Sequence, residues 1–181
     1  MSAQTAKVTK ESSRLTLDQL AASSSETLAQ LYSQGSVPAS LKVLDGAPKG
    51  RMLAVRLIEK SPLADPIQRF AASAFFVWDG KSFQSKGAKT GTGINRVSVP
   101  GILGSQNLFP FDTLIGASAV DGNPTVILDY DKPANPPYIR KIHDEIREVS
   151  PGLYLGPAMW KADTGPVHVL WFALDTHVQT V

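Results

Sequence analysis

Short strand-like segments, each bounded by Gly, Pro, Asn or Asp, follow one another from Arg51 to the end of the chain. Segments of this kind are typical of β-strands when turn-forming residues separate them. They do not alternate with helices in a repeating pattern, which argues against a parallel α/β sheet and favours a barrel or a sandwich. The segments are RMLAVRLIE, KSFQS, INRVSV, FDTLIGAS, TVILDYD, GLYLGPAMWK and VHVLWFALDT, with the turn DGNP at 121–124 between two of them. We therefore predict a mainly β fold of seven or eight antiparallel strands.

The last of these segments favours a barrel over a sandwich. Alternate residues of a strand point to opposite faces, and in VHVLWFALDT both the set that starts at Val167 and the set that starts at His168 are largely apolar. Both faces of this strand must then be covered. A small closed barrel with helices outside it meets this condition, its interior filled by side chains or by one small ligand. We predict a single antiparallel barrel of about eight strands, with a β-sandwich as the alternative.

Two short N-terminal helices are expected before the first strand. Thr16 with Gln19, and Ser23 with Glu26, have the spacing of a capping box, in which two side chains satisfy the first free backbone donors of a helix. Gly35 can take the left-handed conformation of a helix end and should terminate the second helix. The apolar side of this second helix consists of Leu28, Leu31 and Tyr32.

A longer helix is predicted at about 135–147. Asn135 can cap its first turn, and Pro136 suits the first helical position. Apolar residues then recur at helical spacing: Tyr138, Ile139, Ile142 and Ile146. The opposite face would carry ion pairs four residues apart: Arg140 with Asp144, and Lys141 with Glu145. The same cap-and-proline pattern at Asp65 and Pro66 predicts another helix in that region.

The length and composition indicate one domain. A chain of 181 residues with 43% hydrophobic content can bury a sizeable core, while a second domain would be cramped. Residues 1–14 are small and polar, so we expect them to form a disordered tail. The predicted organisation is a tail at 1–14 and a single barrel domain at 15–181 that includes the N-terminal helices.

Several classes of protein are disfavoured by composition and spacing. The chain has no cysteine, which excludes disulfides, thiolate nucleophiles and sulfur-ligated metal sites. A net charge of +2 without a basic, aromatic-rich cluster argues against nucleic-acid binding. No run approaches the roughly 20 apolar residues of a membrane span, and no apolar signal region follows the first residues, so a cytoplasmic protein is expected.

No motif for a cofactor or for a known catalytic site is complete. The segment GAKTGTGINR at 87–96 has Arg96 where a dinucleotide-binding motif needs glycine, and it is predicted to be a hairpin loop. His143, His168 and His177 do not have the spacing of a metal site. We therefore expect no cofactor and no metal, with a single axial haem ligand at His143 left open. The sequence also lacks the GxSxG elbow of serine hydrolases.

A resemblance to known proteins rests on six segments. These are GRMLAVR (50–56), WDGKSF (78–83), GINRV (93–97), LDYDKPANPPYIRKIHDEIREV (128–149), PGLYLGPAMWK (151–161) and LWFALDT (170–176). Together they resemble an uncharacterised bacterial family over nearly all of 15–176. The chain is also similar to the proteins named for a Gly-x-Trp-x-Gly motif, which share an LDY segment and a PGLYLG-like strand. Gly46 and Gly50 hold the glycine positions of that motif, and Pro48 stands where it has tryptophan. The resemblance implies a lipocalin-like small barrel of undetermined activity, with no catalytic residues to carry over.

The first functional hypothesis is a binding protein. A closed barrel could take up a small hydrophobic molecule and orient it with a few polar groups in an otherwise apolar cavity. The candidate ligand-binding residues are Asn95, Arg96, Asp129, Tyr130, His143, Tyr154 and Trp160. Arg96 shares a strand face with Ile94, so a carboxylate such as Asp112 or Asp129, or a ligand anion, is expected to pair with it.

Two other classes of function stay open. One is a cofactor-free isomerase, cyclase or lyase in which His143 acts as acid or base, because its unperturbed pKa lies near 6.5. In that enzyme Tyr130 or Tyr154 would donate a hydrogen bond and Arg96 would hold an anionic group. The other is an interaction protein whose barrel is completely filled. Whether the protein is an enzyme, and its oligomeric state, are left undecided by the sequence.

Overall fold

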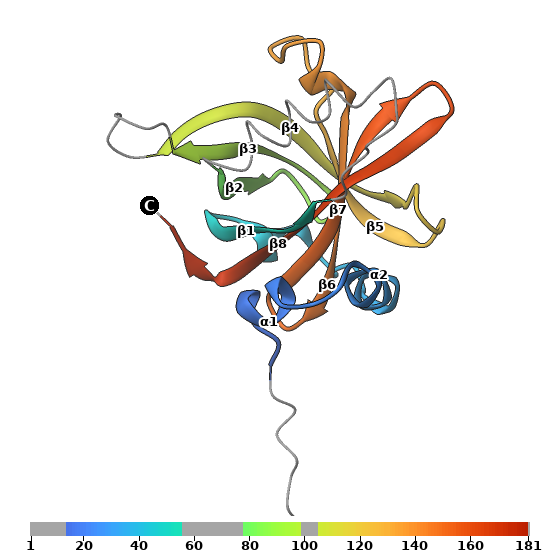
Figure 1. The fold of residues 1–181 in the computed structure, drawn as a ribbon. Helices are drawn as coiled ribbons and strands as arrows, with labels where there is room; N and C mark the ends of the chain where they lie inside the picture. Colours follow the sequence, from blue (N-terminus) through green and yellow to red (C-terminus); the bar gives the residue numbers. More distant parts are fainter. Residues whose placement is uncertain (1–13, 56–77, 99–104, 181) are drawn as a thin grey trace, which may run out of the picture.

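The computed structural model is a closed antiparallel barrel of eight strands (Figure 1). The structure describes residues 14–55, 78–98 and 105–180. Each strand pairs with the next along the chain, and β8 returns to pair with β1. The helices are α1 (Leu17–Ala21), α2 (Ser25–Gln34) and the short 3-10 turns η1 (Leu41–Leu44) and η2 (Ile139–Lys141). The strands are β1 (Pro48–Val55), β2 (Trp78–Ser85), β3 (Thr90–Ser98), β4 (Ser105–Ala117), β5 (Pro124–Asp129), β6 (Ile142–Ser150), β7 (Leu153–Ala162) and β8 (Gly165–Gln179).

The predicted strands are confirmed over the residues that the structure describes, while 56–59 of the first segment and 99 of INRVSV lie outside them. DGNP at 121–124 lies at the connection from β4 to β5. The expected loop at 87–96 is shorter than predicted, because the turn ends at Lys89 and β3 begins at Thr90. Residues 1–13 of the tail expected at 1–14, and the helix expected after Asp65, lie outside the described residues. Arg14 is described, and it forms an ion pair with Asp175.

The helix predicted at about 135–147 is wrong. Only the single 3-10 turn η2 forms there, and β6 begins at Ile142. The segment satisfies a period of two as well as a helical period, since Asp144 and Ile146 face the barrel interior while Glu145 and Arg147 face outward. β-branched residues favour strands, and closure of the barrel needs a partner between β5 and β7. The pairing of β6 with two neighbours therefore outweighs the helical pattern.

The two apolar faces of β8 are covered as the sequence predicts. Leu170, Phe172 and Leu174 belong to the main core inside the barrel. Trp171 and Ala173 belong to a second cluster on the outside, which also contains residues of α1, α2 and β7. The alternation of β8 is interrupted by a shift in its pairing with β7, opposite Ala158 and Met159. His168, which the strand pattern places on the face of Leu170, therefore lies beside Trp171, with ring centroids 4.8 Å apart.

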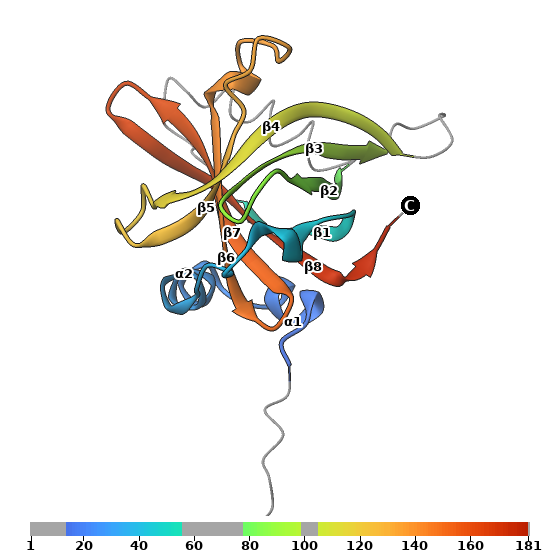
Figure 2. The same cartoon turned by 180° about the vertical axis from the view of Figure 1, so that it is seen from behind.

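The N-terminal helices pack against the outside of the barrel (Figures 1 and 2). α1 begins with the predicted capping box of Thr16 and Gln19. α2 is capped by Ser24, one residue after the predicted cap. It ends at Gly35 as expected, but Gly35 is extended, with a φ of −68°, and does not take the left-handed conformation that was predicted. Leu28 and Tyr32 of α2 are buried against β7 and β8. These helices thus cover the outward apolar face of the strands.

Close packing inside the barrel depends on a glycine in β3. A Cβ atom on Gly93 would overlap the ring of Phe111, which is completely buried. Phe111 in turn contacts Phe83 and Tyr130, with ring centroids 5.5 and 5.1 Å apart. Leu41 and Leu44 of η1 join the same interior cluster, so this part of the barrel is filled by side chains.

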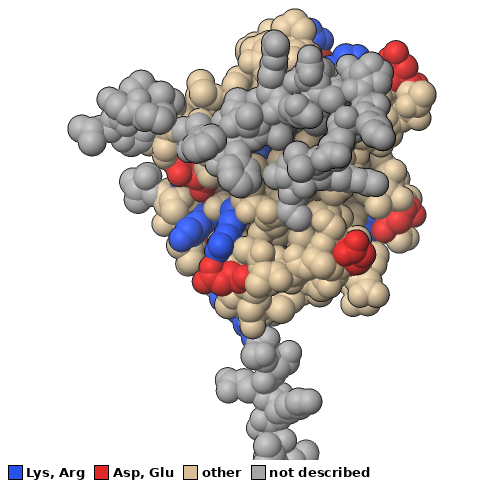
Figure 3. All heavy atoms as spheres, in the orientation of Figure 1, with Lys and Arg blue, Asp and Glu red and all other residues tan. Residues whose placement is uncertain are grey.

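The surface carries charges of both signs. Figure 3 shows basic and acidic side chains scattered among uncharged ones on the face that it presents. This distribution agrees with the small net charge of +2. Within the described ranges, no helix has the length and apolar character needed to cross a membrane.

Candidate functional site

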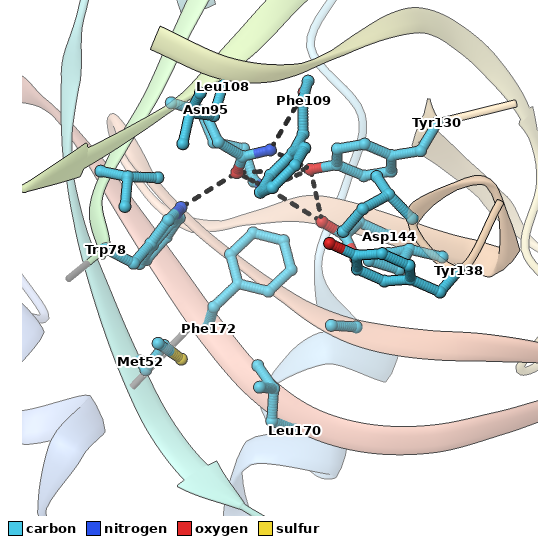
Figure 4. Close-up of a pocket in the computed structure, with 15 residues that line it drawn as sticks. Met52, Trp78, Asn95, Leu108, Phe109, Tyr130, Tyr138, Asp144, Leu170 and Phe172 are labelled. Carbon is cyan, nitrogen blue, oxygen red and sulfur yellow. Dashed lines mark hydrogen bonds and ion pairs between the residues drawn. The ribbon is translucent and has the colours of Figure 1, made fainter. Parts of the chain in front are cut away.

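A cavity of about 240 Å³ lies in the barrel interior beside the filled part of the core (Figure 4). Its wall is mostly apolar and aromatic, with a few polar side chains. The described lining residues are Met52, Trp78, Lys81, Asn95, Val97, Leu108, Phe109, Tyr130, Tyr138, Ile139, Ile142, Asp144, Ala158, Leu170 and Phe172. Tyr138 and Leu108 are 51% and 39% exposed, so they mark the side from which the cavity meets solvent.

A β-bulge aims one of the polar side chains into the cavity. Ile94 pairs with Pro110 and Asn95 pairs with Leu108, which leaves Phe109 as an extra residue in β4. Phe109 has a φ of 58°, an uncommon conformation for a residue with a large side chain. Its carbonyl accepts a hydrogen bond of 3.2 Å from Nδ2 of Asn95. Bulges often redirect side chains next to functional sites, and this one holds Asn95 at the cavity wall.

Four polar side chains of the cavity wall, Lys81, Asn95, Tyr130 and Asp144, form one buried cluster around Lys81, whereas Tyr138 lies half-exposed at the rim. Its Nζ lies 2.9 Å from Oδ2 of Asp144, 2.9 Å from Oδ1 of Asn95 and 2.5 Å from the hydroxyl of Tyr130. Lys81 and Asp144 are 3% exposed, so this is a buried ion pair. The hydroxyl of Tyr130 also lies 3.1 Å from Oδ2 of Asp144, and the indole N–H of Trp78 donates to Oδ1 of Asn95 at 3.0 Å.

Aromatic rings surround the ammonium group of Lys81. Its Nζ lies between 5.0 and 5.3 Å from the ring centroids of Trp78, Phe111, Tyr130 and Phe172. A cation over ring faces is attracted by their quadrupoles, especially where water is excluded. The rings and Asp144 together offset part of the cost of burying the charge.

Burial shifts the pKa of two groups in this cluster. It lowers the pKa of Lys81, although the neighbouring carboxylate of Asp144 acts in the opposite direction. Burial also raises the pKa of Tyr130 well above 10, and the charge of Asp144 adds to this effect. Tyr130 therefore remains protonated at neutral pH and can donate to Asp144.

One oxygen of the cluster has no hydrogen bond. Oδ1 of Asp144 is buried and accepts no hydrogen bond from the described residues, whereas Oδ2 accepts two. Asp144 lies on the cavity wall, directly across the β6–β7 ladder from Ala158. A buried carboxylate oxygen is normally paired, so this atom is the acceptor of the cluster that lacks a partner among the described residues.

Of the residues that we expected at the site, the structure brings Asn95 and Tyr130 together. They lie on β3 and directly after β5, and Nδ2 of Asn95 is 3.1 Å from the Tyr130 hydroxyl. Both line the cavity. The other five residues do not line it.

Two of these five have structural partners elsewhere. Arg96 donates to the backbone carbonyls of Pro48 and Thr180 at 2.8 and 2.6 Å, and to the Thr180 side chain. The carboxylate partners expected for Arg96 are engaged with lysines instead, Asp112 with Lys132 and Asp129 with Lys161. Main-chain oxygens therefore bind the two terminal nitrogens of Arg96, while its buried Nε has no hydrogen-bond partner among the described residues.

The remaining three lie in packed surroundings. Tyr154 is 1% exposed in the filled core, and burial raises its pKa above the ordinary value. Trp160 packs with Val169 in a small separate cluster. Nε2 of His143 is 3.0 Å from Oε1 of Glu145, whose other carboxylate oxygen bonds Tyr32 of the outer helix α2. His143 is thus placed away from the cavity.

Sequence reasoning missed Lys81 and Asp144. Asp144 was assigned to the solvent face of a helix, and this error followed from the wrong period for 135–147. Lys81 had one usable signal, since it shares a strand face with Phe83, and a lysine on an apolar face needs a partner. The identity of that partner depends on which strands meet across the barrel, which the local sequence does not contain.

Metal ligands do not cluster in the parts of the chain that the structure describes. Among residues 14–55, 78–98 and 105–180, no group of three or more His, Cys, Asp or Glu side chains could hold an ion. The haem ligand considered at His143 stays a prediction, which the absorbance of the purified protein would test.

Comparison with known proteins leaves the family open. No protein-family model and no curated protein matches this chain. A crystal structure of a protein from Thermomonospora curvata is similar, with 17% sequence identity and a TM-score of 0.45. The similarity covers 84% of this chain and 87% of that chain.

Proposed function

We propose that this protein binds one small, mostly apolar molecule inside its barrel. The observation that carries the proposal is the cavity itself, whose wall is apolar and aromatic except for polar groups that converge at Lys81 and Asp144. Ligand sites in proteins commonly combine an apolar wall with a few placed polar groups. A lipocalin-like role of this kind also agrees with the capacity of eight-stranded barrels to hold one small ligand.

The size of the cavity limits the ligand. A cavity of about 150 Å³ lined by apolar residues is known to accept benzene in another protein. The cavity here measures about 240 Å³, which suits a substituted single ring or a short branched chain. The rings of Trp78, Phe109 and Phe172 on the wall favour a flat apolar group.

The proposed ligand site uses Asn95 and Tyr130 from the sequence-based candidates, with Lys81 and Asp144 added. Asn95 and Tyr130 hold the ion pair in place, since each bonds Lys81. We propose that the protein binds its ligand in the cytoplasm, the compartment expected from the sequence.

A cavity-filling substitution tests the proposal. Ala158 is 4% exposed on the cavity wall, and Ala158→Phe would place a ring in the space proposed for the ligand. Ala29→Phe is the matched control, because Ala29 is exposed on α2. The purified proteins would be examined by mass spectrometry for a retained molecule and titrated with toluene as an apolar probe.

We expect toluene to bind the wild type and Ala29→Phe with similar affinity. Its affinity for Ala158→Phe should be at least tenfold lower than for the wild type. Circular dichroism and thermal melts would establish that both variants are folded. Equal toluene binding by the wild type and a folded Ala158→Phe would contradict the proposal, as would a wild type that binds no apolar probe.

A further inference from the structure

We propose that the ligand presents a neutral hydrogen-bond donor, a hydroxyl or an N–H group, to Oδ1 of Asp144, so that the cavity selects donors over carboxylates and ethers. This inference rests on the proposed ligand-binding function and specifies the chemical class of the ligand. It follows from an accounting of every polar group in the cavity cluster.

The donors of the cluster are already used. An ammonium group has three N–H donors, and Lys81 directs them to Asn95, Tyr130 and Asp144. The two amide N–H donors of Asn95 bond the Phe109 carbonyl and the Tyr130 hydroxyl. The indole N–H of Trp78 bonds Asn95. A ligand that needs a donor from this cluster would have to break one of these contacts.

The single hydroxyl proton of Tyr130 is used as well. Its oxygen accepts from Lys81 and Asn95, so the proton is directed to an acceptor. Oδ2 of Asp144 lies at 3.1 Å, and Oδ1 of Asn95 lies farther away at 3.5 Å with two other donors on it. The proton therefore points to Asp144.

The acceptors leave one position open. Oδ1 of Asn95 and Oδ2 of Asp144 each accept two hydrogen bonds. Oδ1 of Asp144 accepts none from the described residues, and it is buried. Leaving a buried charged acceptor unpaired is costly, and a ligand donor at this atom would remove the cost.

Charge excludes the other ligand classes. A carboxylate would approach the lone pairs of Asp144 in an apolar cavity, where like charges repel strongly and Lys81 has no N–H left to offer. A cationic ligand would lie close to the ammonium of Lys81, which already neutralises Asp144 at 2.9 Å. A neutral donor meets neither penalty.

Four probes of similar size separate these classes: phenol, anisole, toluene and benzoate. Each contains one ring and suits the cavity volume. Binding to the full-length protein would be measured by isothermal titration calorimetry or by chemical-shift titration at pH 7. We expect phenol to bind at least tenfold more tightly than anisole and toluene, since hydrogen bonds to charged groups are among the stronger ones, and benzoate to bind weakest.

A double variant tests whether Asp144 is responsible. Lys81→Met with Asp144→Leu removes both charges together and leaves side chains of comparable bulk, so neither charge is left unpaired. In this variant the ratio of the affinity for phenol to the affinity for toluene should fall below threefold. Asp129→Asn is the control, because Asp129 is a half-exposed carboxylate paired with Lys161 outside the cavity. It should keep the full preference.

The outcomes distinguish this inference from the proposed function. Toluene, anisole and phenol bound equally well would overturn the donor selectivity while the binding function stands. Benzoate bound more tightly than phenol would also overturn it. If none of the probes binds, both proposals fail together. A phenol preference that persists in the folded double variant would show that another group, not Asp144, recognises the donor.

Discussion

The hydroxyl of Tyr32 donates a hydrogen bond of 2.6 Å to Oε2 of Glu145, which joins α2 to the outer side of β6. Glu145 is completely buried, and it also accepts from the Ser118 hydroxyl and from the backbone N–H of Ala119. Burial raises the pKa of this carboxyl, but its hydrogen bonds with His143, Ser118 and Tyr32 outweigh burial and lower it. One buried carboxylate thus holds the second helix and the connection after β4 on the barrel wall.

The Tyr32→Phe substitution should destabilise the protein by about 1.5–3 kcal/mol, because a hydrogen bond to a buried charge is lost. The ring would keep its packing against Trp171, 5.7 Å away, and its position under the guanidinium of Arg147. Urea denaturation would measure the free energy of unfolding. Tyr138→Phe is the control, since Tyr138 is 51% exposed, and it should change stability little. Equal effects of the two substitutions would contradict the role given to the hydroxyl.

Breaking the buried ion pair from one side should be severe. Lys81→Met leaves the carboxylate of Asp144 buried without its cation, and we expect a loss of about 3–5 kcal/mol. The double variant of Lys81→Met with Asp144→Leu should recover much of this loss, because no charge then stays unpaired. Chemical denaturation measures the free energy of unfolding of the wild type, the two single variants and the double variant. Together the four values give the interaction energy between Lys81 and Asp144. Additive effects of the single substitutions would show that the pair does not act as a unit.

The contact between Arg147 and Asp121 should make stability depend on acid pH. Hydrogen bonds from Arg147 hold the pKa of Asp121 well below its ordinary value of 3.8. A carboxyl group whose pKa is lower in the folded state than in the unfolded state stabilises the fold. This stabilisation is fully present at a pH above the unfolded-state pKa, and it is lost as the pH falls toward the folded-state pKa. Asp121→Asn should therefore differ most from the wild type at pH 7, and the difference should shrink at pH 3. Unfolding free energies at the two pH values check this, and a constant difference would contradict it.

Two truncations test the organisation expected for the N-terminus. Deletion of residues 1–14 should leave the melting temperature nearly unchanged, in keeping with a tail that contributes little apolar surface. Deletion of residues 1–35 should lower it strongly, because Leu20, Leu28 and Tyr32 are almost completely buried and each contributes about 1.5–3 kcal/mol. Differential scanning calorimetry compares the two. Equal melting temperatures would show that α1 and α2 add no stability to the barrel.

Replacement of Arg96 should affect the fold and not the cavity. Arg96 joins β3 to backbone carbonyls of β1 and of the chain end, and it does not line the cavity. Arg96→Met should lower the melting temperature while folded protein keeps its affinity for toluene. A loss of probe affinity at unchanged stability would instead assign Arg96 to the ligand site.

Two of the seven site residues proposed from the sequence line the cavity, and the other five do not. The two are Asn95 and Tyr130, which were proposed as polar groups that orient a ligand in an apolar cavity. Arg96, the residue after Asn95, was proposed on the same ground. Strand alternation and the bulge at Phe109 direct Asn95 into the cavity, so Arg96 points the other way and donates to the backbone of β1. Lys81 and Asp144 are 63 residues apart in the chain, and only barrel closure makes them partners.

The sequence by itself determined a mainly β, antiparallel fold, because turn residues separate short apolar segments, and the two apolar faces of 167–176 favoured a barrel over a sandwich. The closed pairing of β8 with β1 decided for the barrel. The capping box of Thr16 and Gln19 likewise determined where α1 begins. The tertiary structure alone decided that 142–150 is a strand, since the segment fits two periods and the hydrogen bonds to β5 and β7 select one of them. It also decided which polar side chains meet in the interior, because contacts across a barrel depend on register and closure, and neither is encoded within a single segment.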